Sequence, residues 1–210
     1  MKHKTLIIFL FIVFVCGSFV QTRHHHVKHV FDGDTILIDT NEKVRYLGID
    51  APEIGYQREK SEFMALESKD FNLHLIGMTR VRLELDLEKK DRHGRLLAYV
   101  YLKTGEMVNC ILLRKGLAHI MVTRPNLKYL DLLLKHQRLA MVEKLGIWCR
   151  DLVIPPITAE KYYLGSSKSY RFHRPRCPFA GEILPRNLVR FKSRREAFWV
   201  GFSPCKRCRP

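Results

Sequence analysis

The spacing of hydrophobic and polar residues predicts several strands between residues 27 and 148. Hydrophobic and charged residues alternate from Arg80 to Asp86, a period of two that is typical of a half-buried strand. A second strand is expected at 97–102, where an apolar run ends at the turn pair Thr104-Gly105. This part of the chain is therefore expected to contain a sheet with one face in a core.

Two helices are expected in the same region. The first would span about 57–75, with an apolar face formed by Phe63, Leu66 and Leu73. The second would begin at Asn126, which can cap a helix, and would end just before Gly146. Its apolar face would consist of Leu127, Leu130, Leu134 and Met141. Strands and helices together indicate an α+β domain.

The first 20 residues predict a secretory signal peptide. Lys2 and Lys4 precede an apolar run from Leu6 to Val15, and small residues follow that run. Because the run falls short of the roughly 18 residues that a membrane span needs, we expect cleavage and a secreted or extracytoplasmic protein. An uncleaved membrane anchor is the alternative. Residues 23–26, Arg followed by three His, are expected to form a disordered terminus.

Length and charge indicate a second, smaller unit. The chain has 210 residues, more than the roughly 100–150 of a common domain, and the proline pair at 155–156 predicts a linker over 149–160. Residues 161–210 carry 13 Lys and Arg against 2 Asp and Glu, a net +11 of the chain's +16. Such density favours polyanions, with nucleic acid first and an anionic cell surface second, and we infer no obligate protein partner from the sequence.

Candidate chemistry is concentrated in two short acidic turns. Asp34 and Asp50, with a backbone carbonyl, can hold a hard divalent cation, which prefers oxygen ligands. Glu53 can orient or deprotonate a metal-bound water, and Arg45 can stabilise charge that builds on a phosphate. An isolated Asp-Gly-Asp would be an ordinary turn, but this combination predicts a metal-assisted phosphodiesterase.

A third turn, Asp91-Arg92-His93-Gly94-Arg95, adds a second arginine. With it the chain resembles the staphylococcal nuclease (thermonuclease) family from about residue 27 to 148. Further matching motifs are Gly105-Glu106-Met107-Val108-Asn109, Gly116-Leu117-Ala118 and Gly146-Ile147-Trp148. The resemblance implies an α+β fold, a five-stranded OB-type barrel with about three helices, that cleaves DNA or RNA with calcium.

The resemblance also assigns roles to single residues. It matches the calcium ligands to Asp34, Asp50 and the main-chain carbonyl of Ala51, with Asp32 in the outer shell. Glu53 would be the base or water-orienting carboxylate, and Arg45 with Arg95 would clamp the phosphate. Ala51 stands where the family has threonine, but the main-chain oxygen that binds calcium is kept.

The basic segment contains a second constellation, made of His173, Cys177, Cys205 and Cys208. A His-x3-Cys pair and a Cys-x2-Cys pair can form a closed tetrahedral zinc site. A unit of roughly 50 residues buries little core, so a structural zinc would contribute to its folding. Disulfide pairing of Cys205 with Cys208 is the alternative, and pairing of Cys110 with Cys149 is left open.

Residues 172–210 resemble the zinc-binding domain of the Ada methyl-phosphotriester DNA repair protein, most closely over 204–208. His173 stands at the position of that family's methyl-accepting cysteine and cannot act as its thiolate. The resemblance therefore implies a small zinc-stabilised α+β domain at 161–210 that binds DNA, or a scaffold without a ligand.

We expect a secreted calcium-dependent nuclease, with a non-catalytic nucleic-acid-binding or cell-surface protein as the alternative. The histidines at 74, 119 and 136 have no partnering motif and are expected to be structural.

Overall fold

A computed structural model describes residues 23–57, 60–149 and 160–210. The predicted signal peptide at 1–20 and nearly all of the predicted linker at 149–160 lie outside these described residues. Within the described ranges, no helix has both the length and the apolar character that crossing a membrane requires.

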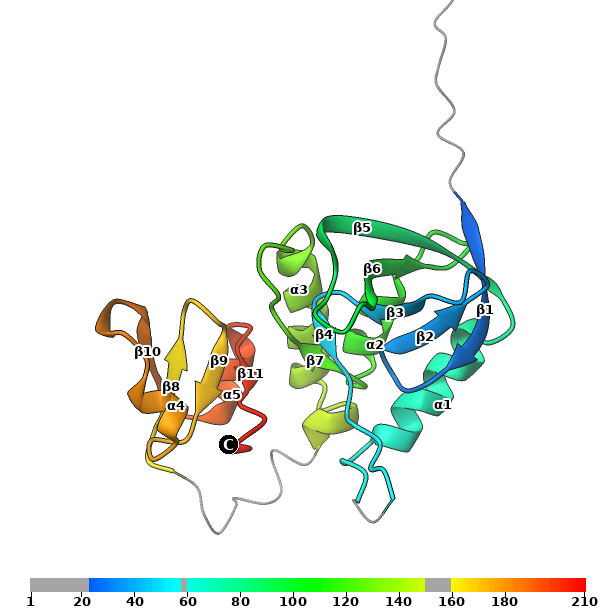
Figure 1. The fold of residues 1–210 in the computed structure, drawn as a ribbon. Coiled ribbons are helices and arrows are strands. Elements are labelled where there is room, and N and C mark those ends of the chain that lie inside the picture. Colours follow the sequence, from blue (N-terminus) through cyan, green and yellow to red (C-terminus); the bar gives the residue numbers. More distant parts are fainter. Residues whose placement is uncertain (1–22, 58–59, 150–159) are drawn as a thin grey trace, which may run out of the picture.

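Five strands close into a barrel in the order β1-β2-β3-β6-β5 (Figure 1). They are β1 His24–Val30, β2 Thr35–Ile38, β3 Lys43–Tyr46, β5 Arg80–Lys90 and β6 Leu96–Tyr101. Neighbours are antiparallel except β3 and β6, which run parallel. Closure pairs every strand of this barrel with two neighbours, and it confirms the predicted five-stranded barrel.

Three main helices surround the barrel, as predicted. They are α1 Ala65–Ile76, α2 Val108–Arg114 and α3 Leu130–Val142, followed by the 3₁₀ helix η1 Gly146–Cys149. A separate antiparallel pair joins β4, Ile49–Asp50, to β7, His119–Ile120. Cys110 is buried on α2, and neither it nor Cys149 forms a disulfide, which answers the question that the sequence left open.

The first predicted helix has different bounds and a different buried face. It begins at Ala65 rather than near residue 57, and Phe63, Leu66 and Leu73 are 37%, 56% and 44% exposed. The buried face carries Ser68 and Asn72, which donate hydrogen bonds to the carbonyls of Leu117 and Asp32 at 2.8 and 3.2 Å. The buried face of α1 therefore includes polar side chains that hydrogen-bond to backbone carbonyls. For this reason the hydrophobic periodicity predicted the wrong buried face.

Asn126 does not cap the next helix, which begins at Leu130. The Asn126 amide is buried and exchanges two hydrogen bonds of 2.8 Å with the backbone of Glu88 on β5. The side chain thus fixes the preceding loop to the barrel instead of starting a helix.

The histidines at 24–26 were expected to be disordered, and this expectation was wrong. They form the start of β1 and pair with Arg80, Val81 and Arg82 of β5. β5 is eleven residues long, and its first three residues pair with the backbone of the three histidines. β1 therefore begins earlier in the chain than its own side chains suggested.

The C-terminal unit is a four-stranded sheet in the order β10-β8-β9-β11. Its strands are β8 Tyr163–Ser166, β9 Arg171–His173, β10 Leu188–Phe191 and β11 Ser203–Pro204. Its helices are α4 Pro178–Gly181, the 3₁₀ helix η2 Pro185–Asn187 and α5 Arg194–Trp199. The small core consists of Tyr163, Phe172, Phe191, Ala197 and Phe202.

The C-terminal unit packs against the barrel unit through α5 and α3 (Figure 1). The Phe198 ring on α5 lies 5.0 Å from the Trp148 ring and 5.2 Å from the Phe172 ring, centroid to centroid. The Gln137 amide donates to the Phe198 carbonyl at 2.6 Å, and Arg138 donates to the Trp199 carbonyl at 2.9 Å. Aromatic and polar contacts together therefore dock the second unit on the first.

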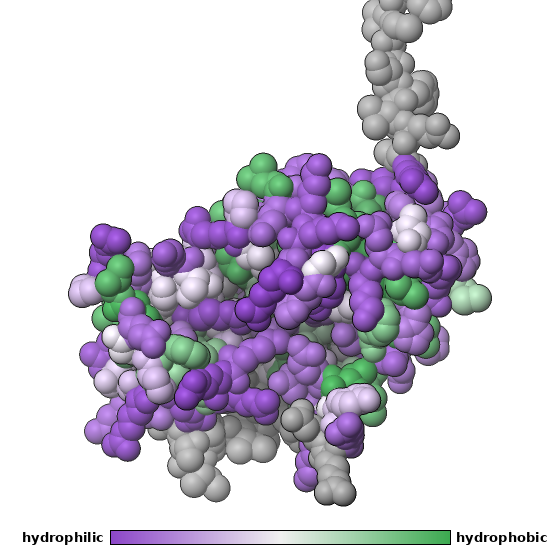
Figure 2. All heavy atoms as spheres, viewed as in Figure 1, coloured by the Kyte–Doolittle hydropathy of each residue, from purple (hydrophilic) through white to green (hydrophobic). Residues whose placement is uncertain are grey.

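The face shown in Figure 2 is mostly hydrophilic, with hydrophobic side chains in small separate groups. Hydrophilic residues extend over both units on this face. The aromatic residues that join the units are correspondingly buried or half-buried.

Candidate active site

The Asp-Gly-Asp turn between β1 and β2 brings its second carboxylate against the segment after β4. A Cβ at Gly33 would collide with the Ser68 hydroxyl and the Ala51 side chain, so only glycine permits this close approach. The backbone N–H of Ala51 donates to Asp34 Oδ2 at 2.6 Å. Asp32 Oδ1 accepts from the backbone N–H of Asp34 at 2.9 Å, which fixes the turn.

Arg45 on β3 lies between two buried carboxylates. Arg45, Asp34 and Asp50 are only 7%, 1% and 4% exposed, and the guanidinium forms ion pairs with both carboxylates. It also donates to the carbonyl of Ile49 at 3.3 Å. Burial acts to raise the pKa of Asp50, but the positive charges of His119, Arg45 and Lys206 outweigh it and lower that pKa.

The two remaining acidic candidates have different surroundings. Burial is the main cause of the raised pKa of Asp32, and the charge of Arg45 opposes it only in part. The Glu53 side chain is 55% exposed, while its backbone is fixed by hydrogen bonds of 2.9 and 3.0 Å with Glu62. An exposed carboxylate on a fixed backbone is accessible to water and to substrate.

Arg95 lies on the turn between β5 and β6 and does not join the buried ion pairs. Its Nε donates to Asp91 Oδ2 at 2.8 Å, and its side chain is 31% exposed. Its charge opposes, by a small contribution, the rise in the pKa of Asp32 that burial causes. The second arginine therefore lies near enough to the acidic turn to influence Asp32, and its side chain is partly exposed to solvent.

The residues present fit a hard cation by their chemistry. Asp34 and Asp50 are buried carboxylates. Asp50 and Glu53 both contact the Lys206 ammonium, so one positive charge serves both of these carboxylates. The carboxylates of Asp34 and Asp50 both pair with the Arg45 guanidinium, so they lie close to one another. All proposed calcium donors are oxygens, as this ion requires.

His119 belongs to the site, although its sequence context indicated a structural role. It pairs with Asp50 across β4 and β7, and its Nε2 lies 3.9 Å from Asp50 Oδ2. Burial lowers its pKa despite the nearby Asp50 carboxylate. No motif surrounds His119 in the sequence, and it is the β4–β7 pairing that places it opposite Asp50 in the structure.

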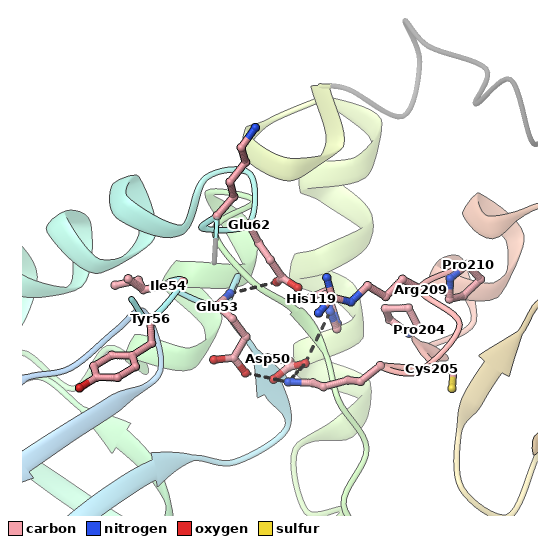
Figure 3. Close-up of a pocket in the computed structure, with 13 residues that line it drawn as sticks. Asp50, Glu53, Ile54, Tyr56, Glu62, His119, Pro204, Cys205, Arg209 and Pro210 are labelled. Atoms are coloured by element: carbon pink, nitrogen blue, oxygen red, sulfur yellow. Dashed lines mark hydrogen bonds and ion pairs between the residues drawn. The ribbon is translucent and has the colours of Figure 1, made fainter. Parts of the chain in front are cut away.

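A cleft of about 690 Å³ opens at this point between the two units (Figure 3). Asp50, Glu53 and His119 line one wall, and the other wall comes from Pro204 to Pro210 at the end of the chain. In Figure 3 the side chains of Asp50 and Glu53 point toward the C-terminal segment, and dashed lines connect them to it. The second unit thus forms part of the candidate site.

The predicted zinc ligands are brought together. The ligand atoms of His173, Cys177, Cys205 and Cys208 all lie within 4.8 Å of one another, and none of these thiols is in a disulfide. Burial acts to raise the pKa of Cys205, but backbone N–H groups of Cys208 and Arg207 donate to its sulfur and lower it. One imidazole nitrogen and three thiolate sulfurs at this spacing suit a four-coordinate zinc.

The closed barrel and the acidic, arginine-bearing site define an OB-type barrel nuclease. The chain belongs to the staphylococcal nuclease family, because the family model described as "Staphylococcal nuclease homologue" matches residues 43–150. The predicted phosphodiester hydrolase is thereby confirmed at the level of the family. The resemblance of residues 172–210 to the Ada domain is supported only by the His and Cys cluster.

Curated relatives agree with this assignment. The chain is 40% identical over 134 residues to a thermonuclease of Staphylococcus intermedius, covering 62% of this chain and 79% of the relative. It is 39% identical to a thermonuclease of Staphylococcus hyicus, covering 59% and 75%. Endonuclease YncB of Bacillus subtilis is 37% identical, with 60% and 61% covered.

Proposed function

We propose that this protein is a calcium-dependent nuclease that hydrolyses phosphodiester bonds in DNA, RNA or both. The observation that carries the proposal is the buried Arg45 between Asp34 and Asp50, with the exposed Glu53 next to them. The names of the relatives, thermonuclease and endonuclease, support the same activity.

The proposed roles follow from charge and exposure. Asp34, Asp50 and the main-chain oxygen of Ala51 would hold calcium. Bound calcium would supply positive charge that polarises the phosphate. Glu53, accessible to solvent, would accept the proton of the attacking water.

Two arginines would bind the phosphate oxygens. Arg45 has more N–H donors than its contacts with the two carboxylates and the Ile49 carbonyl use. Arg95 is partly exposed and has more N–H donors than its pair with Asp91 uses. A guanidinium binds two oxygens of one phosphate as a fork and stabilises negative charge that develops there.

The C-terminal unit is proposed to bind one structural zinc through His173, Cys177, Cys205 and Cys208. The mutual closeness of the four ligand atoms supports this proposal. The net +11 of residues 161–210 favours nucleic acid as the partner of this unit, with an anionic cell surface second.

Secretion is proposed from the sequence of residues 1–20, which resembles a cleaved signal peptide. An uncleaved segment would instead anchor the protein at a membrane. N-terminal sequencing of the protein released by its source cells separates the two outcomes.

The direct test is degradation of plasmid and of single-stranded DNA and RNA in calcium, and again after chelation with EGTA. Because EGTA also binds zinc, the zinc content is measured before and after, and excess calcium is then restored. The proposal expects cleavage in calcium, loss on chelation and recovery on restoration. Binding without cleavage under all conditions would favour the non-catalytic alternative.

A further inference from the structure

Lys206, in the C-terminal unit, reaches the proposed catalytic carboxylates of the barrel unit. Its Nζ lies 2.7 Å from Glu53 Oε1. The same atom lies 3.4 and 3.5 Å from the two carboxylate oxygens of Asp50. Lys206 is separated from these residues by more than 150 positions, so the contact depends on how the two units dock.

The backbone around Lys206 is held from several sides. Lys206 follows Cys205 directly and precedes Cys208 by two residues, so two of the four clustered metal-ligand candidates flank it. The Cys205 N–H donates to the Phe172 carbonyl at 2.9 Å, and the Arg209 N–H donates to the Cys205 carbonyl at 2.9 Å. The turn that presents Lys206 is therefore fixed to the sheet of the C-terminal unit.

The docking of the units is fixed close to the same point. Gln137 on α3 accepts from the backbone N–H of Ile120 and donates to the Phe198 carbonyl, both at 2.6 Å. Ile120 is the neighbour of His119, whose ring lies 5.4 Å from the Phe198 ring. One buried amide thus links the strand of the site histidine to the helix of the second unit.

The Lys206 side chain lines the cleft and is partly exposed to solvent. It is 56% exposed, and its flexible stem ends in a strongly hydrated point charge with three donors. Two further cations, Lys60 and Arg209, line the same cleft. A polyanion that enters the cleft would meet these three positive side chains, Lys206 and Arg209 from the C-terminal unit and Lys60 from the barrel unit.

We propose that Lys206 is a phosphate-binding residue of the nuclease site, so that the C-terminal unit completes this site instead of acting as a separate module. The proposal rests on the nuclease function, because it takes a phosphodiester as the ligand. Without nucleic acid the ammonium pairs with Glu53 and Asp50. When a phosphate enters the cleft, the ammonium exchanges these carboxylates for phosphate oxygens.

The test compares Lys206→Met and Lys206→Arg with Lys192→Met, which removes an exposed lysine of the same unit away from the cleft. Calorimetry with a nucleoside 3′,5′-bisphosphate in calcium measures phosphate binding apart from turnover. A charge-assisted hydrogen bond contributes enough that Lys206→Met should weaken binding about tenfold or more. Lys206→Arg should retain most of the affinity, and Lys192→Met should stay within about twofold of wild type.

Steady-state cleavage of a short oligonucleotide on the same preparations gives the second readout. Lys206→Met should raise KM by a similar factor, with an unchanged melting temperature because the side chain is half exposed. Equal bisphosphate affinity in Lys206→Met and wild type would overturn the proposal. Tighter binding, or faster cleavage at low calcium, would overturn it in favour of a lysine that blocks the site. Absence of cleavage by the wild type would instead refute the proposed function.

Discussion

Gln137→Ala should destabilise the protein strongly, because the Gln137 side chain is fully buried and satisfies two backbone groups of different elements. Its loss leaves the Ile120 N–H and the Phe198 carbonyl without these partners. An unsatisfied buried polar group costs about 1–3 kcal/mol, so two groups together should lower the free energy of unfolding by about 3 kcal/mol or more. For a chain of this size we expect a melting temperature lower by roughly 6–12 °C.

Thermal denaturation followed by circular dichroism measures this loss, with Lys135→Ala as the matched control. Lys135 lies two residues away on the same helix and is exposed, so its removal should change the free energy of unfolding by no more than about 0.5 kcal/mol. If Gln137→Ala melts within about 2 °C of wild type, the amide does not join the units as described, since each kcal/mol should move the midpoint by 2–4 °C.

Three other changes test separate parts of the molecule. Arg95→Lys and Arg45→Lys should each slow single-turnover cleavage by about tenfold or more, because lysine keeps the charge but cannot form the bidentate fork; wild-type rates in both would reject the clamp. Cys205→Ser with Cys208→Ser should remove one zinc per chain by elemental analysis and lower the stability of the C-terminal unit; an unchanged metal content would refute the four-ligand site. Although burial acts to raise the pKa of Glu84, hydrogen bonds from a neighbouring lysine, tyrosine and arginine hold it at about 2, below its usual 4.5. Above pH 4.5 the ionised Glu84 should therefore contribute about 1 kcal/mol to the free energy of unfolding, after allowance for solvent screening, and this contribution should be lost as the pH falls toward 2. Equal unfolding curves for wild type and Glu84→Gln at pH 7 would contradict this.

The five-stranded barrel was expected from the resemblance to the nuclease family, whereas the hydrophobic pattern alone predicted only two of its strands. Alternation over residues 80–86 identified β5, and the apolar run at 97–102 identified β6. The acidic turns and the His and Cys pairs were also visible as short motifs. Each of these features depends on residues that are close in sequence or on a spacing that the chemistry requires.

The missed features depend on packing between distant segments. The face of α1 was mistaken because Ser68 and Asn72 are buried against backbone carbonyls that the sequence does not reveal. His119 joins the site only through the β4–β7 pairing, and Lys206 only through the docking of Phe198 on Trp148. Hydrophobic periodicity cannot identify a buried face that carries polar side chains, and it does not show which distant segment a face contacts.

The chemical role of Glu53 can be measured by single-turnover cleavage of a short oligonucleotide at saturating calcium, with wild type and Glu53→Gln side by side. Glutamine keeps the volume of the side chain but cannot accept the proton of the attacking water. We expect the rate to fall on the order of 10²-fold or more, while calorimetry still detects calcium bound through Asp34 and Asp50 and the melting temperature is unchanged. A rate within about twofold of wild type, with calcium bound, would contradict the assignment of Glu53 as the base of a metal-assisted nuclease.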